Sequence, residues 1–279
     1  MTVYPFVIHL GPLELTGYGL MMMVAFLMAG WAMQLDLRRR GLDEEYAADI
    51  VIAGVVGGLV GAKIWYVLLG HWNALFERGG FVWYGGFLGA TAAILINGWR
   101  RRVSWRFTVE LCSAPLALGY ALGRVGCFLV NDDYGIPSSL PWAMKFPHGL
   151  PATTVANLEG LGVKFPAVMD RAQLIAVHPT QIYETILMML AFWWMWRRRD
   201  HTHRVGWMLG CYLVFAGLER FLVEFVRAKD DHKLWLGGFT LAQATSVALV
   251  ILGVVVLKAW WKPDGQPVSL PKLVPPPPG

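Results

Sequence analysis

Long apolar runs without a charged residue alternate along the chain with short polar stretches. Three such runs, at 15–35, 79–99 and 234–257, are each 21 residues or longer. A bilayer-spanning helix needs roughly 20 apolar residues, so each run is long enough to cross a membrane. Four further apolar segments carry one or a few ionisable residues, at about 47–70, 106–130, 180–196 and 204–226. We therefore predict an all-α polytopic membrane protein with about seven transmembrane helices.

Composition supports this class and changes how the positive charge is interpreted. Hydrophobic residues make up 56% of the 279 positions and charged residues only 15%, whereas soluble domains are roughly a quarter charged. A net charge of +5 would favour nucleic acid as the partner of a soluble protein. Here the basic residues fall in short loops, so we predict no nucleic acid partner and use these residues to assign topology.

Basic residues mark every second loop between the predicted spans. The loops that follow the first, third and fifth spans contain Arg38–40, Arg100–102, and Arg197–199 with Arg204. Short loops on the cytoplasmic side of a membrane carry an excess of Lys and Arg. This rule places the N-terminus outside and the C-terminus in the cytoplasm. The prediction is one transmembrane domain, 1–262, with an outer cap at 131–178 and a disordered, proline-rich cytoplasmic tail at 263–279.

The polar residues inside the spans gather toward one face of the predicted membrane. Arg124 lies six residues before the outer end of its span, roughly 9 Å deep at 1.5 Å per residue. Lys63 lies in the outer half of the second span. Arg220, Glu224 and Arg227 are spaced four and three residues apart, which places them on one helical face.

Intramembrane charges are costly and usually face a bundle interior or a cavity. For Glu184, or for the Arg220–Glu224 pair alone, a structural ion pair explains the residues equally well. For Arg124, Lys63 and Arg220 together, we expect too few neighbouring acids to pair with every cation. An anionic ligand is the economical explanation, and a phosphate at this depth belongs to a phospholipid headgroup.

Glycines accompany these charges. Gly123 and Gly126 flank Arg124, and Gly85 and Gly86 open the third span. Small residues permit close helix packing, and glycine also lets a ligand approach the backbone. Both interpretations stay open for Gly85 and Gly86.

Residues 123–135, GRVGCFLVNDDYG, resemble the signature of the bacterial prolipoprotein diacylglyceryl transferases. Other segments resemble family motifs in the same chain order: TGYGLMMMVAF, GGLVGAKIWYVL, VWYGGFLGA, HPTQIYE and ERFLVEFVR. The resemblance extends from about residue 10 to residue 260. Six ordered motifs are far more specific than any one of them.

The resemblance implies transfer of an sn-1,2-diacylglyceryl group from phosphatidylglycerol to the lipobox cysteine thiol of a preprolipoprotein. The products would be a thioether and glycerol 1-phosphate. The implied partners are these two substrates and membrane lipid, at the outer face of a bacterial inner membrane. No cofactor or metal is expected. The candidate catalytic residues are Arg124, Arg220, Glu224 and Tyr84, and the candidate substrate-binding residues are Arg124, Tyr18, Lys63, Gly85, Gly86, Asp132, His178 and Arg227.

The proton acceptor for the thiol stays open at this point. Tyr84 occupies a position where many family members have a histidine, and a phenol with a pKa near 10 is a poor acceptor at neutral pH. Glu224 is an alternative acceptor, or it orients Arg220, which we prefer because arginines lower the pKa of a nearby carboxylate. His178 is a further candidate, although a structural hydrogen bond beside Pro179 explains it equally well.

Other classes of membrane protein fit the pattern less well. A transporter or flippase of anionic phospholipid is the main alternative, but transporter sites tend to lie near the bilayer midplane. An intramembrane serine protease needs a nucleophilic serine with a histidine base, and Ser113, in the 106–130 segment, has no such context. A CDP-alcohol phosphotransferase would show spaced cytoplasmic aspartates, which this sequence lacks.

Overall fold

A computed structural model describes residues 1–11, 13–70, 82–228 and 239–262. The predicted tail at 263–279 lies outside the described residues. So do the loop at 71–81 and the first part of the last predicted span, 234–238.

Each of the seven predicted spans corresponds to one long helix. These helices are α1 (Gly17–Arg39), α2 (Glu45–Leu68), α3 (Trp83–Arg100), α4 (Trp105–Leu129), α6 (Thr180–Arg197), α7 (Trp207–Val223) and α8 (Leu241–Ala259). A short helix, α5 (Val155–Gly160), lies between α4 and α6. By length and hydropathy, α1, α2, α4 and α8 qualify as membrane-crossing helices among the described residues.

Local sequence explains where several of these helices begin. Thr16, Ser104 and Thr240 precede α1, α4 and α8, and each side chain accepts a hydrogen bond from a backbone N–H of the first turn. Such caps satisfy donors that have no partner within the helix. The start of α7 has no such cap. Instead Glu110 of α4 accepts from the backbone N–H groups of Gly206 and Met208, at 2.7 and 3.1 Å.

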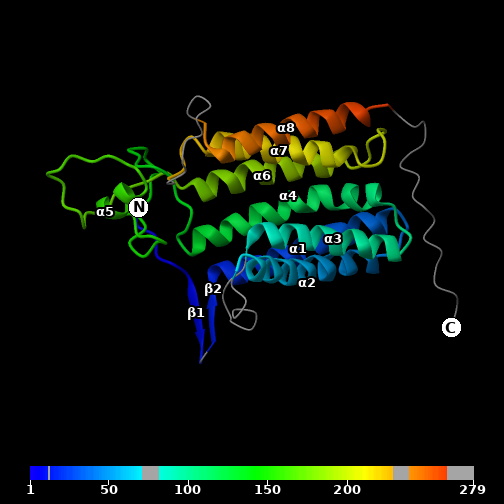
Figure 1. The fold of residues 1–279 in the computed structure, drawn as a ribbon, viewed down its shortest axis with the longest axis horizontal. Coiled ribbons are helices and arrows are strands. Elements are labelled where there is room, and N and C mark those ends of the chain that lie inside the picture. Colours follow the sequence, from blue (N-terminus) through cyan, green and yellow to red (C-terminus); the bar gives the residue numbers. More distant parts are fainter. Residues whose placement is uncertain (12, 71–81, 229–238, 263–279) are drawn as a thin grey trace.

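The long helices run side by side, with α4 in the middle of the bundle (Figure 1). Helix α4 packs on α1, α6 and α7, while α2 pairs with α3 and α7 pairs with α8. Buried residues accordingly occur along most of the length of α4, from Phe107 to Gly126. Arg124 therefore belongs to the helix with the most protein around it, rather than to a lipid-facing one.

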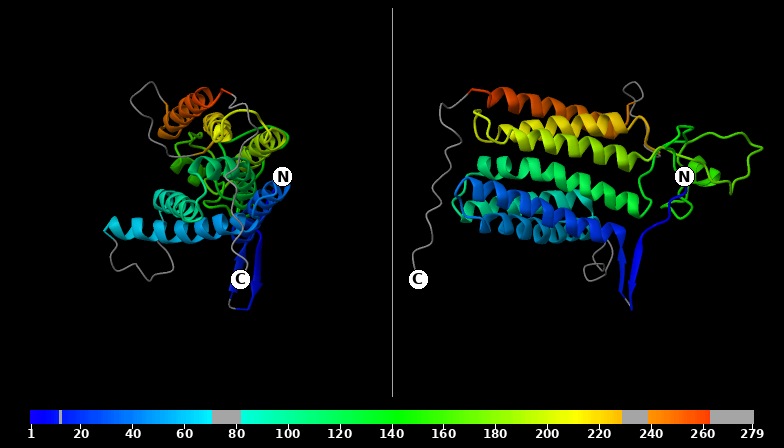
Figure 2. Two further views of the ribbon diagram at one scale, coloured as in Figure 1. Left: turned by 90° about the vertical axis from the view of Figure 1, so that its right-hand side faces the viewer. Right: turned by 180° about the vertical axis from the view of Figure 1, so that it is seen from behind.

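Residues 131–178 fold over one end of the bundle, where α4 ends and α6 begins (Figure 1). Their core contains the buried side chains of Tyr134, Phe146, Leu158 and Val177. The same end carries the N-terminus, and the opposite end carries the arginine-rich turns that follow α1, α3 and α6 (Figures 1 and 2). The cap and the arginine-rich turns therefore lie at opposite ends of the bundle.

The all-α class is confirmed, and the N-terminus adds a short β-hairpin that the sequence analysis did not predict. Strands β1 (Val7–Leu10) and β2 (Leu13–Thr16) form an antiparallel hairpin that pairs Val7 with Thr16. The hairpin projects sideways from the bundle (Figure 2). Apolar and polar residues alternate over Leu13–Thr16, a pattern typical of a strand and much shorter than a membrane span.

Glycines bring α2 and α3 into backbone contact. A Cβ added to Gly61 would lie 2.8 Å from the Cα of Gly89 and closer still to the carbonyl oxygen of Gly85. At Gly58, three residues earlier in α2, an added Cβ would meet Ala90 and Gly86 only at 3.7 Å. The seam at Gly61 is therefore closed to any side chain, while Gly58 leaves room for a methyl group.

We expect Gly61→Ala to destabilise the protein by about 1–3 kcal/mol, because overpacking must separate two backbones. Gly58→Ala is the matched control, in the same helix and with the same added methyl group, and should change stability little. Thermal unfolding of the purified variants in detergent measures the difference. Equal unfolding temperatures for the two variants would contradict the close packing at Gly61.

Candidate active site

Arg124 is surrounded by polar groups from α4, α6 and the loop after α4. Its side chain is 14% exposed. The Nη1 group donates to Asp133 Oδ2 at 2.8 Å, and Nε lies 3.0 Å from Glu184 Oε2. Nε and Nη2 both lie 3.3 Å from the hydroxyl oxygen of Tyr120, one turn earlier on α4. This guanidinium is therefore held in a fixed orientation by two carboxylates and a phenol.

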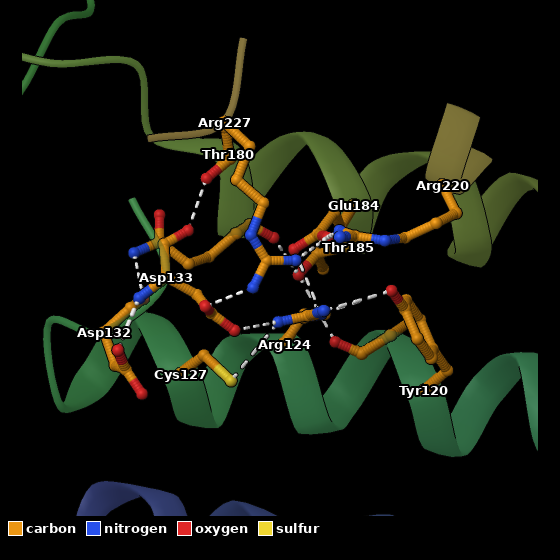
Figure 3. Close-up of polar contacts among 12 residues, drawn as sticks. Tyr120, Arg124, Cys127, Asp132, Asp133, Thr180, Glu184, Thr185, Arg220 and Arg227 are labelled. Carbon is orange, nitrogen blue, oxygen red and sulfur yellow. Dashed lines mark hydrogen bonds and ion pairs between the residues drawn. The ribbon is translucent and has the colours of Figure 1, made fainter. Parts of the chain in front are cut away.

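Glu184 is the centre of the cluster. Its side chain, on the second turn of α6, is 1% exposed and faces α4 (Figure 3). Besides Arg124, it has Arg220 Nη1 at 3.8 Å and Arg227 Nη1 at 4.0 Å from Oε1. Three guanidinium groups from separate parts of the chain thus converge on one buried carboxylate, which the candidate residues from sequence did not include.

Arg220 is aligned from a second side by Glu224. Arg220 Nη2 lies 2.6 Å from Glu224 Oε2, with the usual spacing of four residues along a helix. The other carboxylate oxygen of Glu224 accepts from the hydroxyl of Thr240 at 3.0 Å, just before α8. Glu224 therefore connects Arg220 to the beginning of α8, as an orienting residue would.

The expectation that Arg227 continues the helical face of Arg220 and Glu224 is wrong. Helix α7 ends at Val223, and Glu224 is already its C-cap. Arg227 follows in an extended segment that pairs with Gly135 of the cap, and its side chain bonds to Asp133. Arg227 reaches the cluster by this route and not by helical periodicity.

The expectation of too few acids is also wrong. Arg124, Arg220 and Arg227 each have a carboxylate within 4 Å, from Asp133, Glu184 or Glu224. Helical spacing within one span could not reveal these pairs, because they join different helices and loops. Lys63, which the sequence analysis grouped with Arg124 and Arg220, lies on a different helix, α2.

Spare donor capacity remains on these arginines. The three guanidinium groups together have about fifteen N–H donors, more than the roughly twelve lone-pair sites of three carboxylates. Among the described residues, Arg220 Nη1 and Arg227 Nε are buried with no hydrogen-bond partner. The three arginines and the carboxylates of Asp133, Glu184 and Glu224 balance in charge, yet N–H groups remain available for the oxygens of a further anion.

The pKa values of Asp132 and Asp133, in the loop after α4, are shifted in opposite directions. Asn131 and Asp133 have φ values of 60° and 62°, which Asn and Asp tolerate better than most residues. Burial opposes ionisation of Asp133, but Arg227 and Arg124 outweigh it and lower the pKa of this carboxyl. Burial, together with the charge of Asp133, raises the pKa of Asp132.

The start of α6 fixes this loop in place. The hydroxyl of Thr180 donates to the carbonyl oxygen of Asp133 at 2.6 Å, and the amide of Gln181 donates to that of Asp132. Thr180 and Gln181 are fully buried. The motif HPTQIYE therefore supplies Glu184 and also positions Asp133. These two tasks explain why the polar residues of the motif lie so close together in sequence.

His178 lies at the cap side of the same region. Its Nδ1 is 3.1 Å from the hydroxyl of Tyr183, which also accepts from Trp142 Nε1 at 2.8 Å. Burial lowers the pKa of His178. The contact with Tyr183 matches the structural hydrogen bond that the sequence left as an alternative.

The remaining candidates lie on α1, α2 and α3. Tyr18 is 45% exposed and packs beside Gly126 of α4, one residue before Cys127. Lys63 Nζ lies 6.0 Å from the centre of the Tyr66 ring. Tyr84 is 62% exposed at the start of α3.

Gly85 and Gly86 follow Tyr84 in the first turn of α3. An added Cβ on Gly85 would overlap the backbone of Gly61. Close packing between α2 and α3 therefore accounts for Gly85, whereas the converging arginines come from α4, α7 and the segment after α7.

Four residues of the cluster were not among the candidates from sequence: Tyr120, Asp133, Glu219 and Glu184, the last of which was considered as part of a structural ion pair. Asp133 and Glu184 lie inside the quoted motifs GRVGCFLVNDDYG and HPTQIYE, so a signal for them was present. Tyr120 is one helical turn before Arg124, a spacing that places both on one face. Glu219 is adjacent to Arg220, and nothing in its spacing distinguished it.

The described helices and the buried cluster define a polytopic helical membrane protein with an internal charged site. The model of the prolipoprotein diacylglyceryl transferase family matches residues 5–259. The phosphatidylglycerol–prolipoprotein diacylglyceryl transferase of Paraburkholderia phymatum is 32% identical over 292 residues, covering 94% of each chain. That of Burkholderia thailandensis is 30% identical over 275 residues, covering 91% of this chain and 93% of the relative. The chain belongs to the prolipoprotein diacylglyceryl transferase family, as its motifs indicated.

Proposed function

We propose that this protein transfers the sn-1,2-diacylglyceryl group of phosphatidylglycerol to the lipobox cysteine of preprolipoproteins. The thiol forms a thioether, and glycerol 1-phosphate leaves. The observation that carries the proposal is the convergence of Arg124, Arg220 and Arg227 at one end of the bundle in a chain of this family. Two relatives bear names that state the same donor and acceptor, which disfavours a phospholipid transporter or flippase.

In this proposal all seven long helices cross a bacterial inner membrane, with the N-terminus outside and the C-terminus in the cytoplasm. The arginine-rich turns at the end opposite the cap support this orientation. Residues 1–262 act as one transmembrane domain, and the cap at 131–178 covers the site on the periplasmic side. The lipid enters from the outer leaflet, because the cluster lies at the cap end.

Arg124 and Arg220 hold the phosphate of phosphatidylglycerol with charge-assisted hydrogen bonds. The convergence of these two arginines on Glu184 and the unused N–H groups nearby support this role. The thiolate attacks the sn-3 carbon of the glyceryl group, and the electron pair of the breaking C–O bond stays on the phosphate oxygen. The same arginines stabilise the charge that develops there.

Glu224 orients Arg220 in this mechanism, and Arg227 adds positive potential from the cap side. Tyr18 and Asp132 lie near Arg124 and contact the glycerol headgroup. Lys63 attracts anionic lipid toward the bundle. His178 lies under the cap, where the peptide segment around the lipobox would bind.

Three further candidates open α3. Tyr84 is exposed there, and in the proposal it contacts lipid close to the point of entry. Gly85 and Gly86 would place their backbone beside the bound lipid.

Purified protein in detergent, supplied with phosphatidylglycerol and a lipobox peptide, should release glycerol phosphate and yield a lipidated peptide. A peptide with alanine in place of the lipobox cysteine is the control and should release nothing. Release that does not require the thiol would indicate a phospholipase instead. No release from folded protein, combined with movement of phosphatidylglycerol across vesicle membranes, would favour the transporter.

A further inference from the structure

Glu219 differs from the other acids around the arginine cluster. It is 4% exposed on α7, beside Arg220, and its Oε1 is buried with no hydrogen-bond partner among the described residues. No Lys, Arg or His of the described chain lies within 4 Å of its carboxylate, whereas every other acid of the cluster that is as deeply buried has such a partner. A buried carboxyl oxygen without a partner is costly, which indicates a use other than packing.

The other carboxylates are engaged by cations. Glu184 faces three arginines, Glu224 bonds to Arg220 and Thr240, and Asp133 is held by Arg124 and Arg227. Protonation of any of these carboxylates would weaken the charge-assisted contacts that align the arginines. Their arrangement suits positioning of the arginines, and it leaves the removal of a thiol proton to another group.

Glu219 also lies on the appropriate side of the arginines. Helix α7 packs against α4, and Tyr120 of α4 is one turn further from the cap than Arg124, roughly 6 Å along the helix. Displacement at carbon requires the nucleophile opposite the leaving oxygen. A phosphate held at Arg124 and Arg220 directs the leaving oxygen toward the cap, so the thiol approaches from the deeper side, at the level of Tyr120 and Glu219.

We propose that Glu219 is the proton acceptor for the substrate thiol, with Tyr120 beside it orienting the Arg124 guanidinium. This assignment rests on the proposed function. The S–H proton moves to the Glu219 carboxylate as the S–C bond forms and the C–O bond breaks. The leaving glycerol 1-phosphate takes the electron pair of the C–O bond, and the proton stays on Glu219 until the products leave.

Glu219→Gln keeps the size of the side chain and removes the base. With a cysteine lipobox peptide, kcat for glycerol phosphate release should fall by about 10²–10⁴-fold, the range of general base catalysis, with little change in KM for phosphatidylglycerol. A selenocysteine lipobox peptide, whose selenol is already ionised at neutral pH, should restore most of this loss. Glu45→Gln, at an exposed site at the start of α2, is the matched control and should match wild type with both peptides.

Two results would overturn the assignment. One is wild-type kcat for Glu219→Gln with the cysteine peptide. The other is an equal loss with both peptides, which indicates a structural role. If Glu219→Gln does not fold, Glu219→Asp replaces it, and its partial loss with cysteine should again disappear with selenocysteine. Failure of folded wild type with the cysteine peptide would refute the proposed function itself, and this is seen before any substitution is compared.

Discussion

Replacing Arg124 with alanine should reduce glycerol phosphate release by about 10³-fold or more. Removing a single donor to a developing negative charge costs about 10²–10³ in kcat, and Arg124 offers several N–H groups held by Asp133, Glu184 and Tyr120. The assay compares initial rates at saturating phosphatidylglycerol and lipobox peptide. Arg106→Ala is the matched control, because Arg106 is an exposed arginine at the opposite end of the same helix.

Arg124→Lys separates charge from geometry. A lysine ammonium keeps the positive charge but is a single point of contact, whereas the guanidinium is a planar fork that binds a phosphate through two parallel hydrogen bonds. We expect Arg124→Lys to remain within about tenfold of Arg124→Ala. Near wild-type activity of the lysine variant would show that Arg124 supplies only electrostatic potential. Thermal unfolding of each variant distinguishes loss of chemistry from loss of fold.

The helices were predictable from sequence because lipid imposes a simple rule. A charge-free run such as 15–35 satisfies its backbone only as a helix, and α1 spans Gly17–Arg39 accordingly. The hairpin before it was not predicted, because Val7–Leu10 and Leu13–Thr16 are far shorter than a membrane span and are stabilised by pairing with each other. Helix α7 ends at Val223, and Arg227 lies beyond it in a segment that pairs with Gly135 of the cap, a contact that helical periodicity does not predict.

The site was predictable only for residues whose energetic cost of burial follows from their neighbours in the sequence. Arg124 stands in an apolar run, so its sequence context alone marks it. Glu184 lies near the end of a span, where an acid is ordinary, and its importance arises from the packing of α6 on α4. Asp133 depends on a loop with positive φ, which no periodicity describes. Pairing between elements is the information that a single sequence did not contain.

Glu184→Gln should destabilise the protein by about 3–5 kcal/mol and abolish activity, because breaking a buried ion pair leaves uncompensated charge. With Glu184 neutral, Asp133 and Glu224 face three arginines, and the guanidinium groups repel one another. Thermal unfolding in detergent and glycerol phosphate release measure the two effects. The matched control is Glu159→Gln in α5, whose carboxylate pairs with the exposed Arg171 at 3.5 Å and should contribute at most about 1 kcal/mol.

A double substitution tests whether Glu184 stabilises the cluster as a counter-ion. Arg227 is a partner of Glu184 that is itself 5% exposed, and Arg227→Gln in the Glu184→Gln background restores the balance of charge. If Glu184 acts through its charge, the double variant should be more stable than Glu184→Gln alone, with a coupling of about 0.5–3 kcal/mol. Activity should not return, because the anion site has then lost one arginine and the carboxylate that aligns the other two. Strict additivity of the two substitutions would instead mean that Glu184 acts through its shape and packing against α4.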